Sequence, residues 1–335
     1  MAKSVRMADI AGKLGVSVVT VSKGLRGKDG VSEELRAQIL RTAEEMGYEV
    51  RGGREDTNSY VIGIVTSSRY LERGSSFYWS LYERLLTHLS AGGDFGFLEV
   101  VSPEDEEGCV PPRIVQEGRA DGIIMMGPMP TDYIRMLDRL PVPFTMLDTY
   151  DTSLPFDTVI SDGYFGMSAM TEHLIELGHR KIMYVGTVGA TSSITDRYFG
   201  YCRAMTEAGL TVTPDMVIPD RKDSSALDVH LPKDIAQRAT ALVCNCDLTA
   251  YQVLHQLTAM GLRVPEDISL VGFDNYALPD VAGIRLTTYD VDQDSMAKAS
   301  AQQVRDRIRD PLAKRDVRTI VGGPIQGESV RPIVR

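Results

Sequence analysis

The segment SVVTVSK at residues 17–23 brings hydroxyl, methyl and ammonium groups together within two helical turns. Hydroxyls donate hydrogen bonds to anionic oxygens, methyl groups make apolar contacts, and an ammonium group donates to ring nitrogens and carbonyl oxygens. The residues that supply these groups are Ser17, Val18, Val19, Thr20, Ser22 and Lys23. On one face of a helix they could contact the polar edges and backbone of another molecule.

A second set of candidate side chains lies further along the chain, next to apolar runs. Arginine offers a planar fork of donors that suits vicinal hydroxyls or a carboxylate, and aspartate accepts two hydroxyl hydrogen bonds. An aromatic ring can stack on the apolar face of a sugar or a base. The residues of this set are Phe77, Tyr78, Ser193, Arg197, Asp247 and Asp274. Less specific roles remain open, namely core packing for an aromatic ring, a surface salt bridge for Arg197 and a helix cap for Asp274.

Residues 6–25 predict two short helices joined by a tight turn. Apolar residues recur at helical spacing from 7 to 14, and Gly15 accepts the left-handed backbone of a helix C-cap. Ser17 can cap the second helix, and Val21 and Leu25 face back onto the first. This is the pattern of a helix-turn-helix, whose second helix can lie in the major groove of DNA. The spacing alone fits a small helical hairpin without a ligand equally well.

A third predicted helix favours DNA binding. It opens at Val31-Ser32-Glu33-Glu34, carries apolar residues up to Met46 and closes at Gly47-Tyr48. The stretch DIAGKLGVSVVTVSKGLRGKDGVSEELRAQILRTAEEMGY resembles, almost throughout, the DNA-binding headpiece of the LacI/GalR family of transcription regulators. In such a headpiece we expect the hydroxyls of Ser17, Thr20 and Ser22 to hold phosphates and Lys23 to meet guanine acceptors. Val18 and Val19 would touch thymine methyl groups and favour T over C only weakly.

Length and charge agree with this interpretation. A chain of 335 residues is long for one core, so two or three domains are expected. The net charge is −10, but residues 1–54 hold ten Lys or Arg and seven Asp or Glu, a net of +3, so the remainder carries −13. Phosphates would therefore attract only the N-terminal head. We expect a cytoplasmic protein without a membrane partner, because no continuous apolar run or signal core is found.

The linker at residues 51–59 departs from the family pattern. Relatives usually carry a short hinge helix here, with a Leu that wedges into the minor groove and kinks the DNA. RGGREDTNS has no such Leu, and Gly52-Gly53 disfavours a helix, which places the usual wedging in doubt. Arg51 and Arg54 could reach phosphates or remain solvated linker charges.

From Tyr60 onward, strand-like apolar runs alternate with amphipathic helices. The strand-like runs are VIGIV, FGFLEVV, GIIMM, FTML, TVI, KIMYVG, ALVC and ISLVGF. This order predicts an α/β fold of parallel sheets with helices on both faces. The span is too long for one open sheet, so we expect two lobes that bind a ligand between them, at the carboxyl ends of strands.

The body also resembles the family's effector-binding core. The resemblance is carried by SDGYFGMSAMTEHLIELGHRKIMYVG, MGLRVPEDISLVGFDNY and LTTYDVD. That core is similar to type I periplasmic sugar-binding proteins, with two Rossmann-like lobes linked by three crossings, here near residues 161, 290 and 322. The resemblance implies that Arg197 contacts the effector and that Tyr78, rather than Phe77, stacks on it. The family has Asn-Asp where this chain has Asn245-Cys246-Asp247, so Asp247 matches and Cys246 departs.

These observations give an expected domain organisation. A headpiece occupies residues 1–50, a linker 51–59, and an effector-binding and dimerisation domain 60–335. Lobe 1 is expected at about 60–160 and 291–321, and lobe 2 at about 161–290 and 322–335.

No sequence pattern points to catalysis. His173 and His179 have no nucleophile motif nearby, and the glycines do not form a dinucleotide or phosphate loop. Cys244 and Cys246 lack the further ligands of a metal site and are expected to be structural thiols. We therefore expect no enzyme activity, no cofactor and no metal.

The sequence favours a transcription regulator, with a repressor role, that binds a double-stranded DNA operator as a homodimer. Its operator affinity would be controlled by a small effector, a sugar or sugar derivative, with a purine as runner-up. A solute-binding receptor for sugars without DNA function fits the body equally well, but not the helical head or the missing export signal. A sugar-processing enzyme lacks a paired-carboxylate motif.

Overall fold

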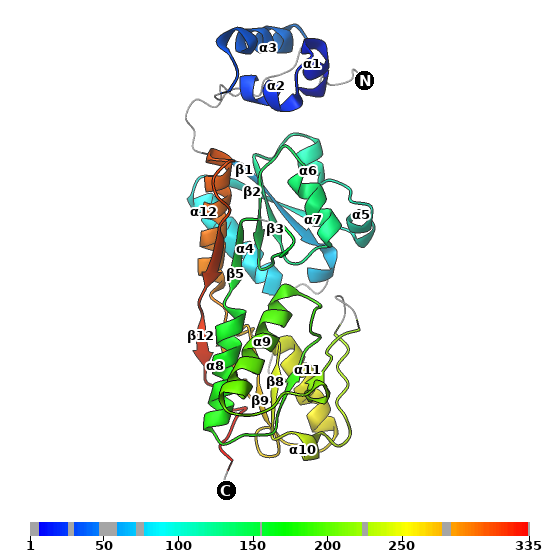
Figure 1. Cartoon of the computed structure of the whole chain (residues 1–335), viewed down its shortest axis with the longest axis vertical. Coiled ribbons are helices and arrows are strands. Elements are labelled where there is room, and N and C mark those ends of the chain that lie inside the picture. Colours follow the sequence, from blue (N-terminus) through cyan, green and yellow to red (C-terminus); the bar gives the residue numbers. More distant parts are fainter. Residues whose placement is uncertain are drawn as a thin grey trace. The chain divides into compact units, whose positions relative to one another are not determined.

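The computed structural model describes residues 7–25, 30–46, 59–71, 77–154, 156–222, 227–276 and 283–333. The chain divides into two compact units, Met1–Ser59 and Tyr60–Arg335, whose elements are labelled in Figure 1. The linker expected at 51–59 and the helix end expected at Gly47-Tyr48 lie outside the described residues, apart from Ser59.

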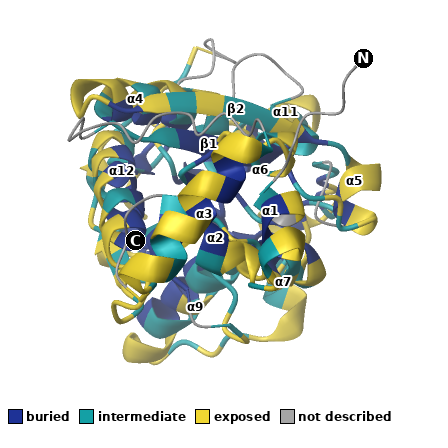
Figure 2. Cartoon of the chain, turned by 90° about the horizontal axis from the view of Figure 1, so that it is seen from above, coloured by how far each residue is buried: buried dark blue, intermediate teal, exposed yellow. Residues whose placement is uncertain are grey.

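The N-terminal unit is a bundle of three helices around a small core. These are α1 (Met7–Leu14), α2 (Val18–Leu25) and α3 (Glu33–Glu45). Gly15, at φ 67°, makes the turn between the first two, as its lack of a Cβ allows. Ser32 caps α3 by accepting a hydrogen bond from the amide of Leu35 at 3.3 Å. The buried centre consists of Ile10, Ala11, Val21, Ile39 and Ala43. Figure 2 shows the buried and exposed sides of α3.

Lobe 1 of the second unit is built on a six-stranded parallel sheet in the order β11-β5-β4-β3-β1-β2. Its strands are β1 (Val61–Ser67), β2 (Phe95–Val101), β3 (Gly122–Met126), β4 (Phe144–Leu147), β5 (Thr158–Ser161) and β11 (Val317–Ile320). Helices α4 (Phe77–Ala91) and α12 (Gln293–Arg309) cover one face (Figure 1). The other face is covered by α7 (Thr131–Asp138), with α5 (Pro103–Glu107), α6 (Arg113–Gln116) and the short η1 (Ser68–Tyr70) at its edges.

Lobe 2 is built on a four-stranded parallel sheet in the order β7-β6-β8-β9. Its strands are β6 (Ile182–Val185), β7 (Val217–Ile218), β8 (Ala241–Cys244) and β9 (Ser269–Val271). Helices α8 (Gly163–Glu176) and α9 (Ser192–Glu207) cover one face, and α10 (Ile235–Arg238) and α11 (Asp247–Ala259) cover the other. The remaining elements are η2 (Pro214–Met216) and the antiparallel pair β10 (Thr288–Asp290) and β12 (Gly323–Ile325).

The chain passes between the lobes three times, from β5 to α8, from β10 to α12 and from β11 to β12. Each sheet lies between two layers of helices. Its strands carry apolar side chains on both faces, so both faces pack against helices. The arrangement confirms the predicted α/β class with parallel sheets and a helical N-terminal region. Among the described residues, no helix combines the length and the apolar character needed to span a membrane.

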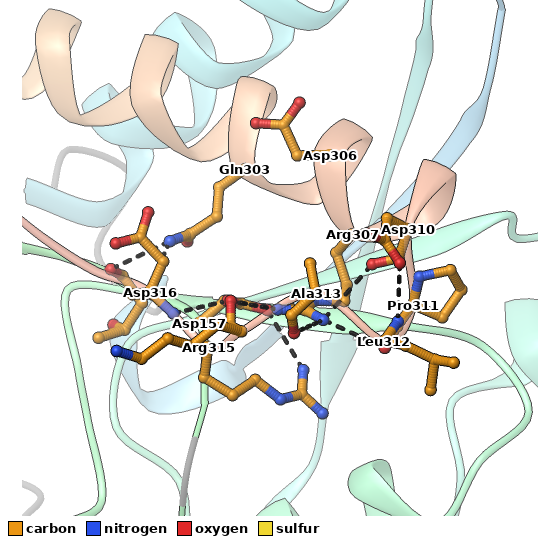
Figure 3. Close-up of polar contacts among 12 residues, drawn as sticks. Asp157, Gln303, Asp306, Arg307, Asp310, Pro311, Leu312, Ala313, Arg315 and Asp316 are labelled. Atoms are coloured by element: carbon orange, nitrogen blue, oxygen red, sulfur yellow. Dashed lines mark hydrogen bonds and ion pairs between the residues drawn. The ribbon is translucent and has the colours of Figure 1, made fainter.

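A buried ion-pair network fixes the return from α12 to β11. Asp157, 2% exposed, accepts hydrogen bonds from Arg307 Nε at 2.6 Å and Nη2 at 2.9 Å, and from Arg315 Nη1 at 3.2 Å. Arg307 also donates to the carbonyls of Pro311 and Ala313, so the turn wraps around its guanidinium (Figure 3). A fully satisfied buried pair of this kind holds one loop conformation.

Candidate functional site

The outward face of α2 carries the residues expected to read DNA. Val18 and Val19 are 39% and 52% exposed, and Lys23 is exposed as well. Val21, on the opposite side of the helix, is fully buried against α1 and α3. Ser17 caps α2, since its Oγ accepts a hydrogen bond from the amide of Thr20 at 3.0 Å. Ser22 lies on α2, but its side chain falls outside what the structure describes.

In the second unit, polar side chains from both lobes meet beyond the carboxyl ends of the strands. Asp148 follows β4 in lobe 1, and Asp247 and Asp274 follow β8 and β9 in lobe 2. Tyr78 enters from the start of α4, and Arg197 enters from α9. Parallel strands direct their carboxyl ends to one edge of each sheet, which explains why residues so distant in sequence gather here.

Arg197 is at the centre of this cluster. It is 5% exposed, and its Nη2 lies 2.8 Å from Asp274 Oδ1, while its Nη1 donates to the carbonyl of Asn245 at 2.7 Å. Its guanidinium also stacks on Phe273, with Cζ 4.0 Å from the ring centre. Arg197 therefore does not form a surface salt bridge. Its helix, α9, begins at Ser192, and Thr191 caps it by accepting a hydrogen bond from the amide of Ile194.

Two carboxylates face Arg197 from opposite lobes. Asp148 is 5% exposed and accepts a hydrogen bond from Tyr78 Oη at 2.9 Å. Burial raises the pKa of Asp148 to about 6, although the charge of Arg197 and the hydrogen bond from Tyr78 act in the opposite direction. Burial likewise raises the pKa of Asp274 to about 6 against the opposing charge of Arg197. Asp274 thus pairs directly with the guanidinium, while Asp148, also buried, feels its charge.

The two predicted aromatic residues have different surroundings. Tyr78 donates its hydroxyl hydrogen bond to Asp148, and its ring packs against that of Tyr70 with the ring centres 4.8 Å apart. Phe77 makes an edge contact with Tyr78 at 5.4 Å and packs, half-buried, against the apolar core. Tyr78 is therefore the aromatic residue next to the charged cluster.

The remaining predicted residues lie close by in different roles. Both carboxylate oxygens of Asp247 already accept hydrogen bonds, from Thr288 Oγ1 at 2.7 Å and from the amide of Tyr276 at 2.8 Å. The hydroxyl of Ser193 lies 3.0 Å from that of Thr191, in the first turn of α9. Cys246 Sγ lies 3.3 Å from Thr249 Oγ1, and Cys244 is buried in the core.

Several residues of the site were missed from the sequence. Asp148 could have been found by the rule that pointed to Asp274, because it directly follows the strand FTML. Tyr150 Oη donates to Asp196 Oδ1 at 2.7 Å, a contact between the lobes that carried no sequence signal. Arg221, whose charge acts on Tyr70, forms a two-pronged pair with the fully buried Asp220, at 3.0 and 2.7 Å.

Comparison with known families separates the chain into the same two parts. Residues 6–50 match the model for bacterial regulatory proteins of the lacI family. Residues 171–330 match the model for the periplasmic binding protein-like domain. The two matches together cover more than half of the chain.

Two relatives match over most of the chain, and both are transcription regulators. The chain is 28% identical over 315 residues to the HTH-type transcriptional repressor PurR of Vibrio atlanticus, covering 90% of this chain and 91% of the relative. It is 26% identical over 295 residues to the HTH-type transcriptional regulator DegA of Bacillus subtilis, covering 84% of each.

Two solved structures show the same fold over nearly the whole chain. A complex of the transcriptional regulator CelR with cellobiose has a TM-score of 0.68 at 23% identity, covering 97% of this chain and 99% of that one. The lac repressor dimer bound to operator and the anti-inducer ONPF has a TM-score of 0.67 at 22% identity, covering 98% and 100%. The chain thus carries the helix-turn-helix DNA-binding domain of the lacI family together with a periplasmic binding protein-like domain, and its relatives are transcription regulators.

Proposed function

We propose that the chain is a homodimeric repressor whose affinity for its operator is set by a small polar effector bound among Tyr78, Asp148, Arg197 and Asp274. The observation that carries this proposal is the meeting of Asp148 from lobe 1 and the Arg197–Asp274 pair from lobe 2 in one buried cluster. A ligand that bridges these groups stabilises one arrangement of the lobes over another, which is the differential binding that control requires.

A sugar or sugar derivative suits these groups best. Each hydroxyl of a sugar can donate to Asp148 or Asp274 and accept from Arg197, and Tyr78 and Tyr70 offer aromatic surface. Arg197 is already paired with Asp274, and Asp148 faces the same space, so an anionic group would meet repulsion there. The CelR structure is a cellobiose complex, which makes cellobiose a rational first compound to test.

For DNA recognition we propose that α2 enters the major groove. Val18, Val19 and Lys23 are available on its exposed side, whereas its apolar side is occupied by the headpiece core. Ser17 and Thr20 stand at its N-terminus, where hydroxyls and backbone amides commonly hold phosphates.

The partner for dimerisation is proposed to be a second copy at the β2 edge of lobe 1. This edge strand exposes Phe95 and Phe97, each 54% exposed, and Val100, 48% exposed. A groove of about 630 Å³ beside it is lined by Phe97, Val110 and Ile114 among others. An uncovered apolar edge favours pairing with another chain, and two headpieces are needed to read a two-fold operator.

Two measurements test the proposal together. Gel retardation of random duplex DNA by the full chain should weaken steeply as salt rises, and a head that does not bind DNA would give no retardation at low salt. A thermal-shift screen against neutral, amino and acidic sugars, including cellobiose, should show a concentration-dependent rise in melting temperature for a neutral sugar. A rise given only by purines or acidic sugars would contradict the proposed effector class.

A further inference from the structure

Asp247 is enclosed by contacts that leave its carboxylate little access to a ligand. The residue is 2% exposed and stands at the start of α11, directly after β8. Its Oδ1 accepts from Thr288 Oγ1 at 2.7 Å, and its Oδ2 accepts from the amide of Tyr276 at 2.8 Å. A Cβ atom added at Gly272 would lie 1.9 Å from Asp247 Oδ1, so backbone also closes this side of the carboxylate.

The segment that Asp247 holds has an unusual backbone. Asp274 and Asn275 adopt φ values of 106° and 50°, a region that non-glycine residues rarely occupy and that costs free energy. Such a conformation persists only when neighbouring contacts impose it. Three hydrogen bonds impose it here. The Tyr276 amide donates to Asp247, the Asp274 amide donates to the carbonyl of Tyr289 at 2.9 Å, and Asn275 Nδ2 donates to Asp290 Oδ1 at 2.8 Å.

This conformation gives Asp274 its place in the effector cluster. From it, Asp274 Oδ1 reaches Arg197 Nη2 at 2.8 Å. If the loop relaxed to an ordinary backbone conformation, the carboxylate would point elsewhere and Arg197 would lose its partner. The geometry of the Arg197–Asp274 pair thus depends on the contacts that hold this loop, one of which Asp247 supplies.

The same carboxylate reaches the crossing between the lobes. Thr288 begins β10, and the chain leaves β10 for α12 of lobe 1 after Asp290. The backbone of Asp274 also forms an isolated parallel β-bridge with the backbone of Asp290. Asp247 therefore connects three separate segments, namely the end of β8, the Asp274 loop and a strand that runs into the other lobe.

We propose that Asp247 is a positioning residue that holds Asp274 against Arg197 and ties this loop to the crossing strand β10, without contacting the effector itself. The inference rests on the proposed effector site. Burial, together with the neighbouring charge of Asp274, raises the pKa of Asp247 to about 7. A carboxyl group whose pKa lies near neutral pH suits a structural hydrogen-bonding role that an uncharged amide can also fill.

Three variants of the full chain test this role. Asp247→Asn keeps an acceptor for the Tyr276 amide and can donate its NH2 to Thr288 Oγ1, so it should preserve the loop. Thr288→Val removes one hydrogen bond to Asp247 while keeping the shape of a buried side chain. Thr171→Val is the matched control, because Thr171 is equally buried in lobe 2 and its hydroxyl only donates to Met167 within α8.

The first readout is hydrogen exchange of the peptide covering residues 272–276, which requires no ligand. We expect exchange in this segment to be at least tenfold faster in Thr288→Val and unchanged in Asp247→Asn and Thr171→Val. The second readout is the apparent affinity for whichever sugar shifts the wild-type melting temperature. It should fall at least tenfold in Thr288→Val and stay within threefold in the other two variants.

Two results would overturn the inference. One is unchanged exchange of residues 272–276 in Thr288→Val. The other is loss of sugar binding in Asp247→Asn with normal exchange, which would mean that the carboxylate contacts the sugar directly. If no compound shifts the wild-type protein, the proposed effector class fails, while the exchange measurement still decides the role of Asp247.

Discussion

Tyr150 Oη donates a hydrogen bond to Asp196 Oδ1 at 2.7 Å, and this contact joins the two lobes one residue away from Arg197. Tyr150 itself follows Asp148 by two residues, in the segment after β4. The two segments that present opposite charges to the proposed effector therefore also hold the lobes together. Lobe closure and effector binding should respond to the same substitutions.

The first prediction concerns this contact. Tyr150→Phe removes a hydrogen bond to a charged group, which typically contributes about 1.5–3 kcal/mol. We expect the closed arrangement to become less favourable, so that residues 148–154 and the start of α9 exchange amide hydrogens faster and the effector binds about tenfold more weakly. Tyr82→Phe is the matched control, because the Tyr82 ring packs against Trp79 within α4 of lobe 1. Equal exchange in both variants would show that Tyr150 does not restrain the lobes.

The second prediction concerns Arg197. Arg197→Ala leaves Asp274 and Asp148 buried without a cation, and unpaired buried charge is costly. We expect no ligand-induced rise in melting temperature, whereas gel retardation of DNA should persist because the headpiece is a separate unit. Arg197→Lys should also fail, since an ammonium group cannot span Asp274 and the Asn245 carbonyl together. A retained response in either variant would move the effector site elsewhere.

A third prediction tests the reading face of α2. Lys23→Ala should lower operator affinity by about 1–3 kcal/mol if the ammonium meets base acceptors. The matched control is Lys13→Ala, because Lys13 is an exposed lysine of the same headpiece that pairs with Glu45 at 3.3 Å. Gel retardation at fixed salt measures both. If the two variants bind equally well, Lys23 does not read bases.

The fourth prediction concerns the dimer. Phe97→Lys places a charge in the middle of the exposed β2 edge and should shift the protein from dimer to monomer in sedimentation velocity. Val321→Lys changes an apolar residue outside β2 that is even more exposed, at 67%, and should leave the dimer intact. A Phe97→Lys dimer as tight as wild type would place the interface on another face.

The fifth prediction follows from the pKa of Asp148. Because the pKa is raised from the usual 3.8 to about 6, the folded chain holds this proton more tightly than the unfolded chain. The contribution of this group to stability is therefore present at low pH and is lost as the pH rises from about 4 to above 6. Asp148→Asn cannot lose stability in this way. The melting temperature of the variant minus that of the wild type should therefore increase from pH 5 to pH 8. A difference independent of pH would mean that Asp148 titrates normally.

The strands were the most predictable part of the fold. Runs such as GIIMM and ALVC are apolar at every position because both faces of a parallel sheet are covered. The helix α12 was not predicted, although it packs on four strands of lobe 1, namely β3, β4, β5 and β11. Its buried side includes Ser300, Gln303 and Arg307, so the apolar periodicity that marks other helices is interrupted.

The site was predictable only in part. Arg197, Asp274 and Tyr78 stand next to strand or helix ends, which sequence patterns locate, and the structure brings them together with Asp148. The contact of Tyr150 with Asp196 joins segments of different lobes, and no local pattern encodes such a pairing. The role of Asp247 was equally hidden, because its partners Thr288 and Tyr276 are 41 and 29 residues away. Whether Val18, Val19 and Lys23 read bases stays a prediction.

The burial of Arg197 has a kinetic consequence. At 5% exposure the guanidinium cannot be reached by a molecule of sugar size until the lobes separate. Capture of an effector would then wait for that separation, however concentrated the effector is. The observed association rate should rise with concentration at first and level off at the rate of spontaneous opening, far below the diffusion limit.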